Sequence, residues 1–378
     1  MKKICIIRSN PVRPDSRVEK EAWTLSKAGY DVHILAWDRE CDHSEQNGTI
    51  VVADREIPIT WLGYKAEYGA GRKSLKPFMK FQMHMRKWIK KHINEYDAFH
   101  ACDFDTAYFS MNIVKRYHKI FVYDIFDFLY GEPKSFFQRT IQKSQFNIIN
   151  KADATIICTE ERKEQIAGSK PVRLCVIHNT PFKAQMSDAN DGDFRLNSDT
   201  DKIKIAYVGI LADERLLTQM ANCIVKHPEI EFHIGGFGYL EKHFIQLEKE
   251  HDNIFFYGRI PYSHALQMEE KCDIMTAIYD PSDENCRRAA PNKFYESLML
   301  GKPVLMARNT GMSRVVEENN IGELIEFSEA GFEIGLKALV DRKNEWNDMS
   351  GRMKRLYQDS FSWEEMDKRL CRLYSDLF

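Results

Sequence analysis

A short segment around residue 290 carries the residues whose types and spacing most clearly suggest chemistry. Pro291 and Asn292 precede a helical pattern that stops at Gly301, and proline before a helix with glycine after it is the usual punctuation. The backbone N–H groups of Asn292, Lys293 and Phe294 would find no acceptor inside this helix and would lie at the positive end of its dipole. With the added charge of the Lys293 side chain, the sequence predicts an anion site at the start of the helix.

Glu296 lies one turn further along the same helix, on the face that looks back toward its start. A carboxylate does not help to bind phosphate, but it accepts hydrogen bonds from two neighbouring hydroxyl groups, such as those of a ribose. A phosphate site with a diol-binding carboxylate beside it describes a nucleotide site. The alternative interpretation is an ordinary capped helix with Lys293 and Glu296 at its surface.

Three other stretches that follow predicted strands could complete a nucleotide site. Gly209 ends a strand and lets the backbone turn tightly beneath a ligand, and Arg215 at the start of the next helix could reach a diphosphate. Gly236 belongs to a glycine-rich turn after the following strand, and Arg259 with Ile260 follows another strand, from which backbone groups could contact a base. Each stretch also has an ordinary alternative, namely a solvated arginine or a simple strand end and turn.

Apolar strands alternate with amphipathic helices along the whole chain, which is typical of right-handed βαβ units in parallel sheets. We therefore predict an α/β fold with two Rossmann-like, doubly wound parallel-sheet domains, residues 1–182 and 202–360. A polar linker covers residues 183–201, and a terminal helix covers residues 361–378. A ligand is expected in a cleft between the two domains, at the carboxyl ends of both sheets.

Polar residues also follow the strands predicted in the first domain. Asn10, Arg13 and Arg17 come after the first strand, and Asp103 and Asp127 come after two later strands. Because the carboxyl ends of parallel strands share one edge of a sheet, we expect these side chains to face the cleft and to bind sugar hydroxyl groups. The aspartates could instead cap their helices or hold a metal pair. The first loop has no G-x-G-x-x-G pattern, which argues against a dehydrogenase.

The remaining potential metal ligands form no recognisable pattern. The nine cysteines are scattered singly, without a C-x-x-C pair. His100 and His178 end apolar strands, where a histidine is more often a satisfied structural residue than a base. We therefore predict no metal, no cofactor, and buried thiols in a reducing compartment.

The composition is that of a globular protein with two differently charged halves. The 378 residues are 43% apolar and 29% charged, and the length favours two domains. Residues 1–180 carry a net charge of +7 and the remainder −9, so the first half is expected to meet something anionic. The start of the chain lacks a signal-peptide pattern, and no stretch reaches the ~18 apolar residues that a membrane span needs. The sequence thus predicts a cytoplasmic protein.

Residues 72–91 contain eight lysines or arginines and no acidic residue. Phe78, Phe81 and Trp88 recur there at helical spacing, and such a basic amphipathic helix fits an anionic membrane surface, here the inner face of the plasma membrane. The alternative is a helix whose apolar stripe packs on the sheet while its basic residues are solvated. Nucleic acid is not an expected partner, because the aromatic residues lie on one face and the second half is acidic.

Taken together, these segments resemble the family 4 glycosyltransferases, retaining enzymes with two facing Rossmann-like domains in the GT-B fold. The resemblance runs nearly from end to end. It implies that the first domain binds the acceptor, that the second binds a nucleotide-sugar donor, and that the terminal helix crosses back to the first domain. The segments that carry it are DSRVEKEAWTLSKAGYDVHIL, YDAFHACDFD, VYDIFD, VIHNTP, YVGIL, HIGGFG, FYGRI, FSWEEMDKRLCRLYSDL and, most specifically, PNKFYESLMLGKPVL, the Pro-Asn-Lys variant seen in bacterial polysaccharide enzymes.

Three positions depart from the family pattern. Arg288 stands where the first of two spaced glutamates is often found, Ile210 where an arginine follows the first donor-strand glycine, and Phe126 where a histidine follows VYDIFD. With these departures, the resemblance implies that only Arg215, Lys293 and the helix start contact the departing diphosphate. It assigns no residue to the transferred sugar.

The resemblance implies that a sugar is transferred with retention from a nucleotide diphosphate sugar to a glycan or lipid-linked acceptor in cell-surface polysaccharide biosynthesis. Arg215 and Lys293 would stabilise the leaving diphosphate, Glu296 would hold the ribose, and the backbone near Arg259 and Ile260 would contact the base. This scheme needs no metal.

Two alternatives remain open from the sequence. The departures suggest a catalytically silent, nucleotide-binding partner of an active transferase. A nucleotide-sugar epimerase of the same architecture would need acidic and histidine groups around the sugar, and Phe126 and Arg288 argue against it.

Overall fold

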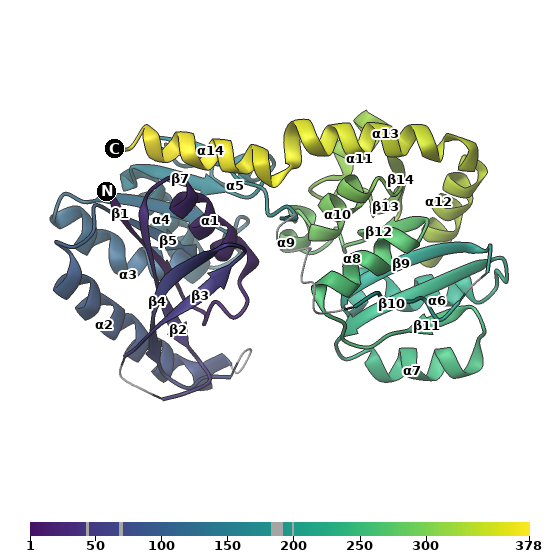
Figure 1. Ribbon diagram of the computed structural model, residues 1–378, viewed down its shortest axis with the longest axis horizontal. Coiled ribbons are helices and arrows are strands. Elements are labelled where there is room, and N and C mark those ends of the chain that lie inside the picture. Colours follow the sequence, from purple (N-terminus) through teal and green to yellow (C-terminus); the bar gives the residue numbers. More distant parts are fainter. Residues whose placement is uncertain (43–44, 68–70, 183–191, 199) are drawn as a thin grey trace. The chain divides into compact units, whose positions relative to one another are not determined.

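The computed structural model describes residues 1–42, 45–67, 71–182, 192–198 and 200–378. The chain divides into two compact units, Met1–Asn179 with Met366–Phe378 and Thr180–Glu365 (Figure 1). Most of the predicted linker lies outside the described residues, at 183–191 and 199.

The first unit contains an eight-stranded sheet with helices on both faces. Its inner strands are buried on both sides, so they read in the sequence as short continuous apolar runs. The elements of this unit, including a terminal helix that begins in the second unit, are β1 (Lys3–Arg8), α1 (Ser16–Lys27), β2 (Asp31–Asp38), β3 (Gln46–Val52), β4 (Arg55–Gly63), η1 (Gly71–Ser74), α2 (Leu75–His92), β5 (Ala98–Cys102), α3 (Asp103–Arg116), β6 (Ile120–Ile125), α4 (Phe136–Lys151), β7 (Ala154–Ile157), α5 (Arg162–Gln165), β8 (Leu174–Val176) and α14 (Trp363–Ser375).

The strand order is β3-β4-β2-β1-β5-β6-β7-β8, and every pair is parallel except the hairpin of β3 with β4. Side chains of alternate strand residues therefore point to opposite faces. Cys5, Phe99 and Phe121 belong to one core cluster with α2, α3 and α4. His100 on the other face contacts Tyr374 of α14. This arrangement confirms the predicted α/β parallel-sheet class.

The second unit contains a six-stranded sheet. Its elements are β9 (Ile203–Ile210), η3 (Asp213–Arg215), α6 (Leu217–Ile224), β10 (Ile230–Phe237), α7 (Glu241–Glu250), β11 (Ile254–Phe256), α8 (Tyr262–Lys271), β12 (Ile274–Thr276), α9 (Glu284–Arg287), α10 (Asn292–Leu300), β13 (Val304–Ala307), α11 (Ser313–Asn319), β14 (Gly322–Ile325), α12 (Glu329–Asp341), η4 (Lys343–Glu345), α13 (Trp346–Leu356) and η5 (Tyr357–Phe361).

All pairs of this sheet are parallel, in the order β11-β10-β9-β12-β13-β14. Ile205 and Phe232 face a core formed with α6, α7 and α12, whereas Met306 packs on the opposite face with α10 and α11. The strands β9 and β12 lie at the centre, so their carboxyl ends place the following loops next to the start of α10.

Two strands escaped the sequence prediction. The edge strand β3 is mostly exposed, so it shows no apolar run, and β14 has only four residues. Helix α3 starts at Asp103, directly after β5, which places Asp103 and Asp105 in its first turn.

The aromatic stripe of the basic helix α2 packs inside the protein. Phe81, Met85, Trp88 and Ile89 are buried in the core of the first unit. The prediction that this stripe meets a membrane is therefore wrong, because the sheet already covers it. The outward side of α2 is different: Leu75, Met79 and Met83 are exposed among exposed lysines.

His233 on β10 is buried, and both of its ring nitrogens and one face of its ring contact other side chains. Its Nδ1 lies 2.9 Å from the Tyr257 hydroxyl, its Nε2 lies 3.3 Å from Glu231 Oε2, and its ring stacks on Phe255 with centroids 4.8 Å apart. Burial lowers the pKa of His233 to about 4, although Glu231 raises it. The folded protein therefore favours the neutral ring.

Because the folded pKa of His233 lies below the unfolded value, the unfolded chain binds more protons between pH 6.5 and 4, and stability falls as the pH falls. We predict that His233 alone removes about 1–2 kcal/mol of unfolding free energy between pH 7 and pH 5. Urea unfolding at both pH values should show this loss in the wild type and a smaller loss in His233→Gln. An equal loss in both proteins would contradict it.

Candidate nucleotide site in the second unit

The start of α10 is less open than the sequence suggested. Pro291 is its N-cap, with φ −68° and no side-chain cap bond, and Gly301 at φ 70° ends the helix as predicted. The Phe294 amide donates to the Pro291 carbonyl at 2.9 Å, and the Phe294 side chain is fully buried. The expectation of a free amide at Phe294 is therefore wrong, and the anion site has to rest on Lys293 and the first amides of the helix.

The side chain of Lys293 extends from α10 to the end of β9. Its Nζ lies 5.1 Å from the centre of the Tyr207 ring. A Cβ atom placed on Gly209 would lie 2.6 Å from the same Nζ. The absence of a side chain at residue 209 thus leaves room for the ammonium group at the carboxyl end of β9.

Arg215 lies at the end of η3, close to the same strand. Its guanidinium carbon lies 3.7 Å from the centre of the Tyr279 ring, and NH1 donates to the Glu214 carbonyl at 3.3 Å and to Cys286 Sγ at 3.5 Å. Lys293 and Arg215 both lower the pKa of the Tyr207 phenol, which burial raises. Two cations therefore share one group of tyrosine rings.

Among the residues that the structure describes, no ion pair joins Lys293 or Arg215 to a carboxylate, but the carboxyl groups of Glu296 and Glu269 lie near Lys293. Burial opposes the charge on Lys293, but Tyr279, Tyr207 and Glu296 raise its pKa above the ordinary value. Arg215 likewise keeps its charge despite burial, with Tyr279 as its main support. The site presents two positive charges that form no direct ion pair among the described residues, although Glu296 and Glu269 lie close enough to raise the pKa of Lys293. Such an arrangement has the electrostatic character of an anion site.

Glu296 lies on α10 with only 5% of its surface exposed. It accepts a hydrogen bond from Tyr262 of α8, and burial together with the charge of Glu296 raises the pKa of the Tyr262 phenol. The carboxyl group of Glu269 on α8 is also close, and burial and Glu296 raise its pKa well above the ordinary value. Glu296 is thus held in place from α8, one helical turn from Lys293.

Three glycines, Gly209, Gly236 and Gly258, lie at the strand ends beside these side chains. Gly236 pairs with Gly209 across β10 and β9, and its amide donates to the Gly258 carbonyl at 2.7 Å. A Cβ on Gly236 would lie 1.8 Å from the Gly209 oxygen. The two strands can therefore approach each other here only without a side chain at residue 236.

The residues predicted to contact the base follow β11. The guanidinium of Arg259 lies 4.8 Å from the centre of the Phe237 ring, and Ile260 packs near Gly235. Phe237 and Ile210 are exposed at the ends of β10 and β9. Ile210 thus presents an apolar side chain where the family pattern has an arginine.

In the first unit, a polar cluster occupies the carboxyl ends of β1 and β5. Asn10 Nδ2 and Arg8 Nε each donate to Asp15 Oδ2 at 2.7 Å. Arg8 also pairs with Asp103, which accepts from the amides of Phe126 and Asp127 at 3.0 and 3.2 Å. Burial raises the pKa of Asp103 to about 6, although Arg8 lowers it. The Asp103 carboxyl group therefore holds Arg8 and the backbone of residues 126 and 127 together at this edge of the sheet.

Arg17 does not face a ligand, which corrects the sequence prediction. It is 3% exposed, its NH2 lies 2.8 Å from Asp124 Oδ1, and its NH1 donates to the Ile177 carbonyl at 2.6 Å. Glu21 lies 3.2 Å from its Nε. Arg17 neutralises buried acids because an unpaired carboxylate in the core would be costly.

Arg13 and Asp127 remain accessible. Arg13 is exposed, and its guanidinium lies 3.7 Å from the centre of the Trp61 ring. The Asp127 side chain is 61% exposed and lies 3.2 Å from Arg162 NH2. Phe126, at the departure position, packs against the guanidinium groups of Arg8 and Arg17 at 4.3 and 4.8 Å.

His100, Cys102 and Asp124 are the one group of potential metal ligands found among the described residues, with ligand atoms within 4.8 Å of one another. All three are buried, His100 Nδ1 lies 2.9 Å from the Tyr374 hydroxyl, and Asp124 is paired with Arg17. The positive charge that a metal would supply to Asp124 is therefore already provided by a guanidinium group.

Sequence reasoning missed Tyr207, Tyr279, Tyr262 and Glu269. Tyr207 is the last aromatic residue before Gly209, and Tyr279 ends the apolar run of β12, so a polar ring at a strand end was the available signal. Nothing in the sequence brings Glu269 to Glu296, because α8 and α10 meet only in the folded unit.

A family model described as Glycosyltransferase Family 4 matches residues 17–180. No curated protein matches the sequence. Among solved structures, sucrose-phosphate synthase from Thermosynechococcus elongatus superposes with a TM-score of 0.73 at 14% identity, covering 100% of this chain and 99% of that one. The chain has the GT-B fold.

Two further structures show the same similarity. HepE from Anabaena in complex with UDP has a TM-score of 0.68 at 13% identity, with 100% of each chain covered. The E. coli structure described as trehalose-6-phosphate bound with UDP-2-fluoro glucose has a TM-score of 0.72 at 10% identity, covering 99% of this chain and 98% of that one. At these identities the similarity establishes the fold alone.

We predict that alanine substitutions at Gly209, Gly236 and Gly258 lower the stability of the protein by different amounts. Gly236→Ala should destabilise the protein by about 1–3 kcal/mol beyond its backbone strain, because the new methyl group meets the Gly209 carbonyl. Gly209→Ala meets the flexible end of Lys293 and the Tyr207 hydroxyl but no backbone atom within the nearest contacts, and Gly258→Ala meets open space at φ +62°, so each should cost less, about 1–2 kcal/mol. Chemical unfolding measures the order. Equal losses in the three variants would contradict the close approach of β9 and β10.

Proposed function

We propose that this protein transfers a glycosyl group from a nucleotide diphosphate sugar to a glycan or lipid-linked acceptor, with retention at the anomeric carbon. The observation that carries the proposal is the pair Lys293 and Arg215, two cations that lie against tyrosine rings and form no ion pair among the described residues of the second unit. A diphosphate carries two negatively charged phosphate groups, so each of the two cations can contact one of them.

The reaction breaks the bond between the anomeric carbon and the diphosphate oxygen, and the electron pair of that bond leaves with the diphosphate. A new bond forms between the anomeric carbon and the acceptor oxygen, whose proton passes to the departing phosphate. Negative charge therefore grows on the diphosphate in the transition state, where Lys293 and Arg215 stabilise it more than in the ground state. This scheme uses protein cations in place of a metal.

The remaining donor contacts follow from the same site. Lys293 offers its ammonium group and its backbone amide in the first turn of α10 to a phosphate, and Glu296, which Tyr262 holds in place, accepts from the ribose hydroxyls. Gly209 and Gly236 allow the backbone to approach the diphosphate. The base lies against the backbone of Arg259 and Ile260.

The acceptor is assigned to the first unit, at the carboxyl ends of β1, β5 and β6. Arg13 and Asp127 are the predicted residues whose exposed side chains could contact hydroxyl groups there, and Asp103 positions Asp127 through its amide. Asn10 is engaged at both ends of its side chain, with Asp15 and the Val12 amide. The structures of HepE with UDP and of the E. coli protein with a UDP-sugar analogue support a nucleotide-sugar donor. The role in cell-surface polysaccharide assembly rests on the resemblance described above.

The proposal predicts that nucleotide diphosphates bind through the two cations. Lys293→Ala and Arg215→Ala should each weaken UDP, GDP or ADP binding at least about tenfold, since each removes a charge-assisted contact. Isothermal titration of the three nucleotides measures this, with Lys337→Ala as control because Lys337 is exposed on α12 and pairs with Asp341. Unchanged affinity in both site variants would overturn the site.

Turnover separates transfer from binding alone. Wild-type protein with the preferred nucleotide sugar and candidate acceptors should release nucleotide diphosphate and form a glycoside of unchanged anomeric configuration. Binding without turnover of any acceptor would favour the silent-partner alternative, and epimerisation of the sugar would favour the epimerase.

We further propose that the outward side of α2 meets an anionic membrane that carries the acceptor. Leu75, Met79 and Met83 form an exposed apolar row at i,i+4 spacing, and Lys76 and Lys80 lie beside it. Apolar residues that enter the interface, flanked by lysines that contact lipid phosphates, are the features of a peripheral helix. No helix among the described residues is long and apolar enough to cross a membrane.

Vesicle flotation tests this surface. The protein should float with vesicles that contain phosphatidylserine and should dissociate as salt rises, because about 1 kcal/mol per lysine is electrostatic. Lys76→Glu together with Lys80→Glu should abolish binding, whereas Lys337→Glu should not. Binding that is absent, or unaffected by the double substitution, would contradict the membrane surface without touching the nucleotide site.

A further inference from the structure

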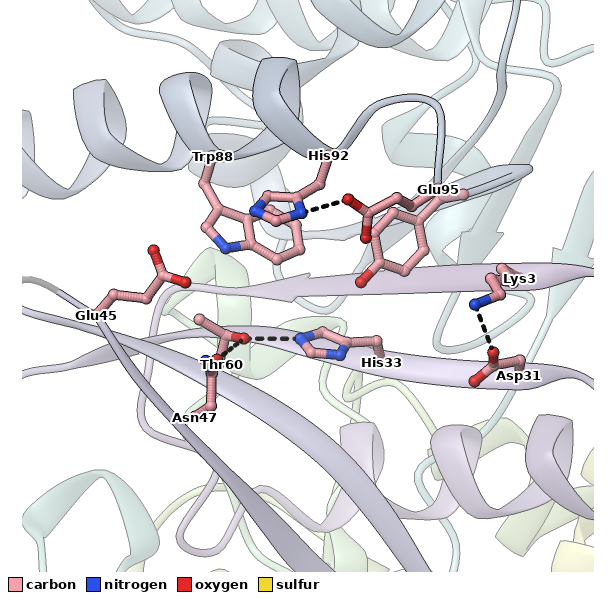
Figure 2. A pocket seen from close by; sticks show the side chains of 10 residues that line it. Lys3, Asp31, His33, Glu45, Asn47, Thr60, Trp88, His92 and Glu95 are labelled. Atoms are coloured by element: carbon pink, nitrogen blue, oxygen red, sulfur yellow. Dashed lines mark hydrogen bonds and ion pairs between the residues drawn. The ribbon is translucent and has the colours of Figure 1, made fainter.

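A cavity of about 350 Å³ opens in the first unit at the amino ends of β1 and β2, between α2 and the β3–β4 hairpin (Figure 2). Lys3 and Asp31, at its border, begin these two strands, whereas the acceptor cluster around Arg8 and Asp103 follows the opposite strand ends. Because parallel strands present different residues at their two ends, the cavity is separate from that cluster. Its size is in the range of small-molecule sites.

Trp88 supplies a buried hydrogen-bond donor that has no protein partner. Its side chain is 4% exposed, and its indole Nε1 makes no hydrogen bond among the described residues. Figure 2 shows this nitrogen pointing from α2 toward the space bordered by Glu45 and Thr60. A buried N–H without an acceptor is costly, so the geometry calls for an acceptor oxygen inside the cavity.

The opposite wall is fixed by a chain of hydrogen bonds. Thr60 Oγ1 donates to Asn47 Oδ1 at 2.7 Å and lies 2.9 Å from His33 Nε2, which is therefore the donor to Thr60. Burial lowers the pKa of His33 to about 4, so the ring is neutral at physiological pH. Since Thr60 occupies the Asn47 oxygen, the amide nitrogen of Asn47 remains as a second donor to a ligand.

Acidic groups complete the lining. Asp31 pairs with Lys3 at 3.1 Å, and Glu95 pairs with His92 at 2.8 Å. Glu45 has no ion pair among the described residues. The cavity thus combines N–H donors with carboxylate acceptors and an excess of negative charge. Hydroxyl groups, which both donate and accept, match this lining, whereas phosphate and acidic sugars are repelled.

We propose that this cavity is an accessory binding site for a neutral saccharide unit. The sugar hydroxyls donate to the carboxylates of Glu45 and Glu95 and accept from the indole of Trp88 and the amide of Asn47. The inference does not depend on the transfer reaction or on the nucleotide site in the second unit. It implies that the first unit holds a glycan at a place where no chemistry occurs.

Titration of the full-length protein with methyl glucoside, methyl galactoside and glucuronate, followed by saturation-transfer NMR, tests the site. We expect a neutral glycoside to bind in the millimolar range and glucuronate to bind at least about tenfold more weakly. Trp88→Phe keeps the aromatic packing but removes the N–H, and it should weaken binding about fivefold to tenfold. The matched control is Trp23→Phe, because the Trp23 indole donates to Asp54 on the exposed surface at 2.8 Å.

The inference has three ways to fail. The first contrary result is that neither glycoside binds the wild type at millimolar concentration. The second is that Trp88→Phe binds as well as the wild type, as expected if water satisfies the indole. The third is that spermidine binds in a Glu45-dependent manner while both glycosides do not. The last result would identify a site for organic cations. Asn47→Ala, on the exposed β3, provides a second variant should Trp88→Phe lose its fold by circular dichroism.

Discussion

Two positive charges that form no ion pair among the described residues are the constraint on which the candidate site depends. A buried ammonium group is usually paired with a carboxylate or gives up its proton. Lys293 instead lies against the Tyr207 ring and Arg215 against the Tyr279 ring, and Glu296 and Glu269 help to raise the pKa of Lys293 without forming an ion pair with it. The strand end at Gly209 has no side chain, which leaves the space that the ammonium occupies. Lys293 and Arg215 therefore have positive charge available for a bound anion.

The first unit uses buried charge in the opposite way. Arg17 is surrounded by Asp124 and Glu21, and although burial raises the pKa of Asp124, Arg17 brings it down to about 2. Burial and the charge of Asp124 raise the pKa of Glu21 instead, as expected when two carboxyl groups share one guanidinium. His100 connects this network to Tyr374 of α14. The network therefore joins α1, the sheet and the end of the chain, and it explains why Met366–Phe378 belongs to the first unit.

Much of the fold could be predicted because its strands are buried on both faces. Ile120–Ile125 is largely apolar, apart from Asp124, and is buried in the sheet, whereas Gln46–Val52 at the sheet edge is mostly exposed and shows no apolar run. Gly209 could be placed because it ends a buried strand, and Lys293 because it stands at a helix start that Pro291 and Gly301 delimit. Arg17 could not, because a basic residue in a first helical turn looks the same whether it faces solvent or two buried acids.

The sequence by itself determined the alternation of strands and helices, the glycines at strand ends and the helix that begins after Pro291, because each depends on neighbouring residues. Only the tertiary structure decided which charges are paired. In the folded protein Arg17 pairs with Asp124, whereas Lys293 and Arg215 form no ion pair among the described residues. The Phe294 amide is hydrogen-bonded, and the aromatic stripe of α2 is buried. Pairing depends on distances between residues far apart in the chain, and local sequence does not encode those distances.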